Sequence, residues 1–331
     1  MTKTKKQKKE SPLTRLKNHI KKLTKEKIPL ATKNLGFSYA NRPVLKNVNI
    51  KVHGGKIVAI IGKSGSGKST FLNLIAGVIA KSYKGEIRIL GKKKLFAKDD
   101  IGYVPQEISL IPDLTLAENL IYLGALYGIP KEKALKRGAS LLKKMRMNAP
   151  KTAYPHELSG GEKVRLNIAV SLLHNPKIII LDEPFVGLDF YNRKLLWQFL
   201  EQQKKAGKSI ILTTHLLTES EAYADKIVIL KDGNIYMHGK VEKIKQKLHT
   251  HYILEIKFRH LSQKNTSEIK SYCSKKTAEI LDIYNHDIMF SIETEGQKNY
   301  LLRHLDKLKL DYRIISFREP NLDEIFLRAG I

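Results

Sequence analysis

Three short runs of large apolar residues have the composition of buried β-strands. They are Lys56–Ile61, Ile178–Leu181 and Ser209–Thr214. Continuous apolar runs of this length are typical of parallel strands that are covered on both faces. Apolar-rich helices are predicted over Ser69–Ile75 and over roughly residues 162–174. The pattern therefore predicts an α/β fold with a mainly parallel sheet and helices on both of its faces.

Two further segments fill in the main domain, which we place at residues 31–245. Lys231–Asn234 has the composition of a hairpin turn, which predicts an antiparallel β portion. An inserted helical subdomain is predicted at about residues 107–172, because this segment separates the first half of the predicted sheet from the second.

The pattern changes again near residue 250. Tyr252–Phe258 alternates between apolar and polar residues, as a half-buried strand does. Two strand–helix alternations follow, near residues 287–294 and 311–317. We therefore expect a separate, small C-terminal α+β domain over residues 250–331.

Residues 1–30 are predicted to be a basic N-terminal extension. From Ser11 onward, apolar residues recur at helical spacing among lysine and arginine, which predicts an amphipathic helix. Such a helix suits an anionic membrane surface. The alternative, in which its apolar stripe packs on the rest of the chain, is equally open.

Composition narrows the class of protein. The chain has 331 residues, 42% of them hydrophobic, but no apolar run approaches the length of a membrane span. Its single cysteine, Cys273, excludes an internal disulfide and suits a reducing cytosol. The net charge of +28 is partly local, because residues 1–33 hold 12 Lys and Arg against Glu10 and Glu26. The rest is diffuse, which favours a general lysine bias over a nucleic-acid site.

The segment between the first predicted strand and its helix fits G-x-x-x-x-G-K-[ST], a phosphate-binding loop. Its glycines let backbone N–H groups surround phosphate oxygens, and the helix N-terminus adds positive dipole there. The lysine is expected to reach the β- and γ-phosphates of a nucleotide, and the serine after it to bind Mg²⁺. The candidate nucleotide-binding residues are Gly62, Ser64, Gly65, Ser66, Gly67, Lys68, Ser69 and Thr70.

Polar residues follow the second and third predicted strands. Asp182 and Glu183 come directly after Ile178–Leu181, and His215 follows the third run. An acidic residue after four large apolar residues is unfavourable unless a cation or a hydrogen bond compensates for its burial. We therefore expect a cation or a hydrogen-bond donor beside Asp182 and Glu183.

Further motifs complete an ordered set. Gln106 follows Gly-Tyr-Val-Pro, Leu158–Glu162 spells Leu-Ser-Gly-Gly-Glu, and Gly187–Asp189 spells Gly-Leu-Asp. With the motifs above, this order resembles the nucleotide-binding domain of ATP-binding cassette (ABC) proteins, strongly over the main domain and weakly over the C-terminal domain. The resemblance implies a P-loop NTPase cassette that binds ATP and Mg²⁺ and hydrolyses the ATP.

The resemblance also implies roles around the bound ATP. Asp182 would hold Mg²⁺, largely through water, together with Ser69 and Gln106. Glu183 would polarise the attacking water, and His215 would contact the γ-phosphate and position that water. Gln106 would also respond to a transport partner.

One aromatic residue is expected to stack on the adenine. Tyr39, which lies 23 residues before Gly62, is the favoured candidate. Phe37 is the competing candidate, and one of the two is expected to belong to the core instead.

The signature Ser159, Gly160 and Gly161 is expected to bind ATP held by the opposite subunit. One chain would then carry two half-sites, and Asp189 would lie at the seam between a homo- or heterodimeric pair. Glu162 stands where the family has glutamine. It adds a negative charge near this site.

The function favoured by the resemblance is that of a transporter ATPase with a separately encoded transmembrane permease. The protein would then be cytoplasmic and peripheral on the inner face of the cell membrane. Pro112–Leu120 and Pro320–Leu327 resemble segments of the exporter branch that serves drugs, sodium and polysaccharides. The alternative is a soluble ABC ATPase associated with nucleic acid or ribosomes. The single P-loop and the absence of a long heptad region count against this alternative. The sequence does not specify the transported cargo.

Overall fold

The computed structural model describes residues 28–93, 98–247, 252–274 and 278–329. The predicted N-terminal amphipathic helix lies outside the described residues. The chain divides into two compact units, Met1–Gly239 and Lys240–Ile331. Each unit has its own sheet and its own hydrophobic core, so the two are described one after the other.

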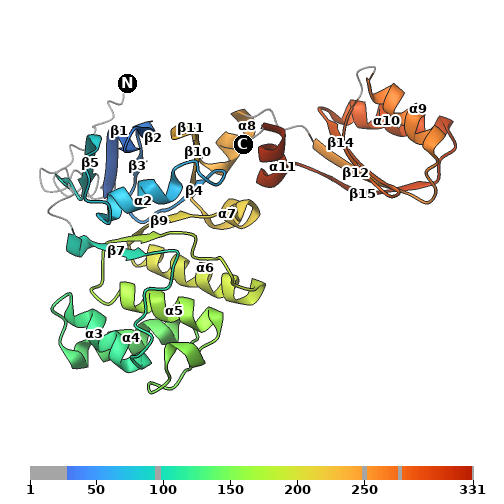
Figure 1. Ribbon diagram of the computed structural model, residues 1–331. Coiled ribbons are helices and arrows are strands. Elements are labelled where there is room, and N and C mark those ends of the chain that lie inside the picture. The colour runs from blue at the N-terminus through green and yellow to red at the C-terminus, as the bar shows by residue number, and fades with distance from the viewer. Residues whose placement is uncertain (1–27, 94–97, 248–251, 275–277, 330–331) are drawn as a thin grey trace, which may run out of the picture. The chain divides into compact units, whose positions relative to one another are not determined.

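A six-stranded sheet forms the centre of the first unit (Figure 1). Five of its strands run parallel, and only the edge strand β11 is antiparallel to its neighbour. Every residue of β4, β8 and β9 is buried, which confirms the interpretation of the three apolar runs. In spatial order the strands are β11 (Asn234–Gly239), β10 (Lys226–Lys231), β4 (Ile57–Ile61), β9 (Ser209–Thr213), β8 (Ile178–Leu181) and β7 (Ile101–Val104).

A second, antiparallel sheet packs beside the first within this unit. Its apolar side chains, such as Leu35, Phe37 and Ile87, join those of β4 and of the helix after it in one core cluster. The strands of this sheet are β1 (Leu30–Tyr39), β2 (Arg42–Val48), β3 (Lys51–Val52), β5 (Lys84–Ile89) and β6 (Lys92–Lys93).

Helices cover the main sheet, and three of them, α3, α4 and α5, gather in a subdomain of their own (Figure 1). Thr115 begins α3 with a capping box, in which its hydroxyl accepts from the backbone N–H of Glu118 and the Glu118 carboxylate accepts from the backbone N–H of Thr115. The α-helices of the unit are α2 (Lys68–Ala76), α3 (Leu116–Ala125), α4 (Lys131–Lys144), α5 (Gly160–Ser171), α6 (Phe190–Lys205) and α7 (Leu217–Tyr223), and the short 3-10 helices are η2 (Lys98–Asp100) and η3 (Pro155–Glu157).

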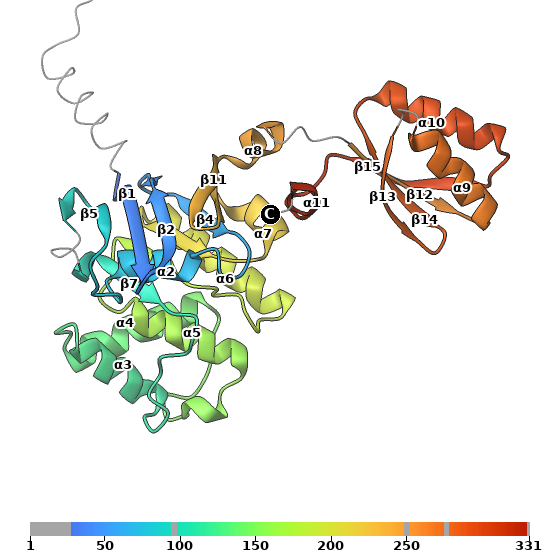
Figure 2. The same cartoon turned by 45° about the horizontal axis from the view of Figure 1, so that its top comes forward.

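The second unit contains a four-stranded antiparallel sheet with two helices on one face (Figure 2). In spatial order its strands are β13 (Glu279–Tyr284), β14 (Asp287–Ile292), β12 (Tyr252–Phe258) and β15 (Tyr312–Arg318). This order and the sequence β-α-β-β-α-β make it a split βαβ unit of the ferredoxin-like type. Leu254, Ile256 and Phe258 of the central strand pack against Ile269 and Leu301 of the two helices.

One strand of this sheet, β13, was not predicted from the sequence. β13 contains Glu279 and Asp282 among its apolar residues, so its alternation is weak. The elements of the second unit are α8 (Val241–Lys247), β12 (Tyr252–Phe258), α9 (Gln263–Tyr272), β13 (Glu279–Tyr284), β14 (Asp287–Ile292), α10 (Glu295–Lys307), β15 (Tyr312–Arg318) and α11 (Leu322–Ala329).

Candidate functional site

A pocket of about 1030 Å³ lies where the strands of the main sheet end. Ligands of open parallel sheets bind at this carboxyl edge. The lining side chains come from segments that are far apart in the sequence: Tyr39, Arg42, Pro43, Val44, Lys46, Gly62, Lys63, Ser64, Gly65, Gly67, Lys68, Ser69, Thr70, Gln106, Glu183, Val186, His215, Asp232 and Gly233.

The loop between β4 and α2 forms one wall of this pocket. A Cβ at Gly62 would lie 2.2 Å from the Leu230 carbonyl oxygen, so only glycine fits there. Gly67 caps α2 with φ of 101° and no side-chain cap, which leaves the first N–H groups of the helix for an anion. The Lys68 ammonium donates to the carbonyl oxygens of Gly62 (2.8 Å) and Lys63 (3.2 Å).

Ser66 differs from the other residues of the loop. It is 6% exposed and does not line the pocket, although the sequence placed it among the nucleotide contacts. Its backbone N–H donates to Lys63, and its carbonyl accepts from Gly233. These two hydrogen bonds join Ser66 to Lys63 in the same loop and to the turn between β10 and β11, and its contact with a nucleotide stays a prediction.

A chain of hydrogen bonds joins α2, β8 and β9 at the base of the pocket. Asp182 is 3% exposed, and its Oδ1 accepts from Ser69 Oγ (3.1 Å) and Thr213 Oγ1 (2.6 Å). Thr213 Oγ1 in turn accepts from the backbone N–H of Glu183 at 2.8 Å. Burial, followed by the Asp182 charge, raises the pKa of Tyr103, whose hydroxyl donates to Asn73. The network fixes both acidic residues relative to the loop.

Glu183 and His215 face the pocket together. Glu183 Oε2 lies 3.1 Å from His215 Nδ1, and both residues line the pocket with Gln106. The Glu183 backbone is in the left-handed region, with φ of 47°. Non-glycine residues adopt this conformation rarely and at a cost in free energy, and such residues cluster at functional sites.

The two aromatic candidates occupy different environments. Tyr39 lines the pocket and is 43% exposed, whereas Phe37 is 4% exposed within the core. Their rings meet edge to face at a centroid distance of 4.9 Å. Tyr39 is therefore the one that is available to stack on a planar ligand.

The predicted signature lies elsewhere on the same unit. Ser159 caps α5 through a capping box: its hydroxyl accepts from the Glu162 N–H, and its N–H and hydroxyl both donate to Glu162 Oε2, at 3.0 and 2.7 Å. These hydrogen bonds, the side-chain one first, lower the pKa of Glu162. Glu162 therefore acts as a helix cap, which the spacing Ser-x-x-Glu could have predicted.

Asp189 and the signature are linked through Asn192. Asp189 caps α6 and accepts from the backbone N–H and the side-chain amide of Asn192, at 2.8 and 2.7 Å; the backbone hydrogen bond is the main cause of its lowered pKa. A Cβ on Gly161 would lie 2.9 Å from the same amide. We call Ser159, Gly160, Gly161 and Asp189 the signature face. None of the four is among the described residues that line the pocket.

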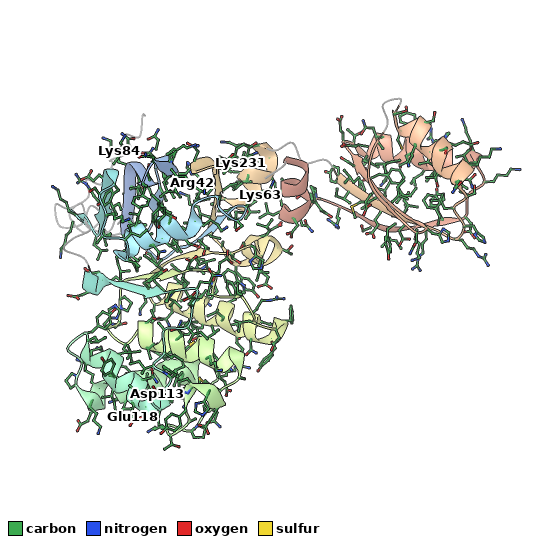
Figure 3. All side chains as sticks on the ribbon, viewed as in Figure 1. Arg42, Lys63, Lys84, Asp113, Glu118 and Lys231 are labelled. Atoms are coloured by element: carbon green, nitrogen blue, oxygen red, sulfur yellow. The ribbon has the colours of Figure 1, made fainter. Side chains whose placement is uncertain are left out.

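Several pocket residues were missed by the sequence analysis. Arg42 and Lys46 come from β2, and Asp232 and Gly233 come from the turn between β10 and β11 (Arg42 is labelled in Figure 3). A hydrogen bond of 2.8 Å from Lys46 N–H to Gly233 C=O joins these two segments. No local signal marks them, because only the packing of the hairpin turn against β2 brings them to the loop.

Comparison with known proteins identifies the class of the chain. Residues 45–186 match the family described as ABC transporter. A linearmycin resistance ATP-binding protein of Bacillus subtilis is 28% identical over 90% of this chain and 97% of its own length. A Nod factor export ATP-binding protein of Rhizobium etli is 30% identical over 88% of this chain and 90% of its own.

Solved structures agree with this match. A dimeric ATP-binding cassette in a post-hydrolysis state, bound to ADP and Pi, is 31% identical and has a TM-score of 0.57, over 64% of this chain and 98% of its own. Within the part of the chain that the structure describes, no helix has the length and apolarity needed to cross a membrane. The expected fold and activity are confirmed: the chain is an ATPase that belongs to the family of ABC transporter ATP-binding proteins.

Proposed function

We propose that this ATPase drives an exporter, in which two nucleotide-binding subunits close around two Mg-ATP and move a separately encoded transmembrane permease. The observation that carries the proposal is the separation of two half-sites on one unit. The pocket holds the P-loop, Glu183 and His215, while the signature face lies outside it. A second subunit, identical or not, would supply its signature face to this pocket.

The pocket residues divide the work of holding ATP. Tyr39 stacks on the adenine, an interaction of about 1–3 kcal/mol by analogy with other base–aromatic stacking. The loop N–H groups and the Lys68 ammonium bind the phosphates, and Lys68 exchanges its bonds to two loop carbonyls for phosphate oxygens.

The residues at the base of the pocket fit Mg²⁺. Such an ion is usually held by one or two carboxylates, a hydroxyl and the phosphates, with water completing the octahedron. Ser69 Oγ and Asp182 Oδ1 already lie 3.1 Å apart, and Gln106 lines the same pocket. These three residues would hold the ion, which neutralises phosphate charge when it is bound.

Glu183 is the proposed general base. Its carboxylate lies in the pocket beside His215, and its N–H is held by Thr213. In this position it accepts the proton of the attacking water, and the His215 ring orients that water and the γ-phosphate. Proton transfer of this kind contributes about 10²–10⁴ in rate.

The direction of transport and the location rest on the relatives. Their names state resistance to linearmycin and export of Nod factor, and they match over both units of this chain. We therefore place the protein on the cytoplasmic face of the cell membrane, where its permease partner would hold it.

The test is a pull-down of tagged Glu183→Gln protein from detergent-solubilised native membranes, with and without Mg-ATP. Recovery of a polytopic membrane protein, enhanced by Mg-ATP, is the expected result. A Lys68→Ala variant, which loses its phosphate contact, is the control and should show no enhancement. Recovery of ribosomes or nucleic-acid complexes without a membrane protein would overturn the transporter assignment and favour the soluble alternative.

A further inference from the structure

A second cavity, of about 710 Å³, lies at the opposite end of the main sheet from the ATP pocket. Strands β4 and β10 connect the two cavities. Val58 and Lys226 near their beginnings line the second cavity, whereas Gly62 and Asp232 after their ends line the first. Val58 and Gly62 are four residues apart along the chain, and Lys226 and Asp232 are six apart. At the rise of a β-strand these separations correspond to about 13 and 20 Å, so the two cavities are separate sites.

Both sheets of the first unit form the walls of this second cavity. The antiparallel sheet contributes β1, β3 and β5, and the main sheet contributes β4, β10 and β11, which lie in the same part of the unit in Figures 1 and 2. We call it the inter-sheet pocket. It is lined by Ala31, Thr32, Lys33, Asn49, Ile50, Lys51, His53, Val58, Glu86, Arg88, Lys226, Val228 and His238.

The charges on the inter-sheet pocket are mostly of one sign. Four cationic side chains line it against the single carboxylate of Glu86. That carboxylate is paired with Arg88, whose Nε lies 2.9 Å from Glu86 Oε1. Lys33, Lys51 and Lys226 remain, and within the described residues no side chain or backbone group forms a hydrogen bond or ion pair with their ammonium groups.

Buried apolar side chains form part of the lining of the inter-sheet pocket. Ile50, Val58 and Val228 are 7%, 1% and 3% exposed, and they belong to the core cluster of the unit. A concave surface with cationic groups of one sign and low-dielectric walls concentrates the electrostatic potential that attracts an anion. A volume of this size is within the range of about 300–1,000 Å³ that is usual for small-molecule sites.

We propose that the inter-sheet pocket binds a phosphate-bearing ligand of nucleotide size. Its phosphate groups lie among the ammonium groups of Lys33, Lys51 and Lys226, and its less polar part covers Val58 and Val228. Lysine ammonium groups are compact charges that bind phosphate oxygens without a fixed bidentate geometry. The phosphate can belong to a soluble molecule or to a lipid headgroup, and the binding chemistry is the same.

The proposal is tested with full-length protein that carries Lys68→Ala, so that phosphate binding in the ATP pocket is weakened. The pocket variant adds Lys33→Glu and Lys226→Glu to this protein. The matched control adds Lys131→Glu and Lys133→Glu on α4, two exposed lysines outside both pockets, and has the same net charge. All three proteins keep the basic residues 1–27, so binding by that segment is common to them.

Inorganic tripolyphosphate, measured by calorimetry, is the soluble probe. The pocket variant should bind it about tenfold or more weakly than the parent, which corresponds to roughly 1.4 kcal/mol, while the control stays within about twofold. The affinity of the parent should fall as NaCl is added, because salt screens these exposed charges.

Sedimentation with vesicles distinguishes the two sources of phosphate. Vesicles of phosphatidylglycerol and phosphatidylcholine are compared with vesicles of phosphatidylcholine alone. If the pocket variant, but not the control, loses binding to anionic vesicles, the ligand is a lipid headgroup. If the pocket variant loses tripolyphosphate binding but keeps vesicle binding, the ligand is a soluble molecule. Equal loss in pocket and control variants, or no loss in either assay, overturns the proposal.

Folding and basal activity provide the internal check. In protein with Lys68 intact, the Lys33→Glu, Lys226→Glu substitutions should leave basal ATPase activity and the unfolding temperature unchanged, because neither lysine lines the ATP pocket. A single Lys51→Ala variant provides a milder test of the same site. It should weaken tripolyphosphate binding in the Lys68→Ala protein, and unchanged binding would count against the proposed ligand position.

Discussion

The ATP pocket and the signature face differ in how their polar groups are satisfied. Behind the pocket lining, buried Asp182 and Thr213 connect Ser69 and Glu183, which line it, through hydrogen bonds that cross the fold. On the signature face, Ser159 and Asp189 are exposed and satisfy the ends of their own helices. The first region is assembled by the fold of one chain. The second is a set of exposed helix N-termini. Their remaining backbone N–H groups can bind an anionic ligand held by another subunit.

The largest effect is expected at Glu183. Glu183→Gln should lower kcat by about a hundredfold or more, because the amide cannot accept the proton of the attacking water. The variant should still bind ATP and accumulate as a dimer, seen by light scattering after size exclusion. Glu132→Gln, at an exposed position of α4, is the control and should behave as wild type. Normal turnover in Glu183→Gln would show that another group is the base.

Gly160→Val distinguishes the two regions directly. Nothing lies within 4 Å of a Cβ at Gly160, so the free energy of unfolding of the variant should lie within about 0.5 kcal/mol of the wild-type value. The new side chain would project from the signature face and block an opposing nucleotide, so ATPase activity should fall about tenfold or more. Gly161→Val is the contrasting variant. It should destabilise the folded chain, because its Cβ would meet Asn192 at 2.9 Å. Full activity in Gly160→Val would remove the signature face from the mechanism.

Thr213→Val examines the network inside the pocket. It removes the hydroxyl that donates to Asp182 and accepts from the Glu183 N–H, at a fully buried position. Leaving these groups unsatisfied should lower the free energy of unfolding by about 1–3 kcal/mol, measured with urea, and should also lower kcat. Thr213→Ser keeps the hydroxyl and should lose only about 0.8 kcal/mol with the methyl group. Equal losses in the two variants would contradict this role of the hydroxyl.

The smallest effect is expected at Glu162. Glu162→Gln retains an acceptor for Ser159 and removes one exposed charge from the signature face, so the ATP concentration for half-maximal activity should fall by less than about threefold. The wild-type cap should also depend on pH. Because the pKa of Glu162 is lowered in the folded state, its contribution to stability is present above the ordinary value of 4.5 and is lost as the pH falls through the folded value. A stability gain on acidification that depends on Glu162 would reverse this sign.

Features that depend on residues close together in the sequence could be predicted, whereas contacts between distant segments could not. The loop at Gly62–Thr70 could be located because a buried strand precedes it and a helix follows it, and both elements are present. Thr213 was not singled out, because its bond to Asp182 spans 31 positions. Arg42 and Asp232 could not be placed on the pocket either, because only the fold brings these distant segments of the chain together. β13 was missed because its charged positions weaken the alternation of an exposed edge strand.

Because the backbone of Glu183 is left-handed, the residue that would make this position most stable differs from the residue that catalysis requires. Asparagine tolerates this conformation better than glutamate, by up to about 1 kcal/mol, so Glu183→Asn should raise the temperature of unfolding while it abolishes turnover. A scanning calorimetry run would show this, and a lower unfolding temperature would exclude it. Selection for thermal robustness alone would therefore favour loss of the proposed base, and only the demand for hydrolysis retains glutamate there.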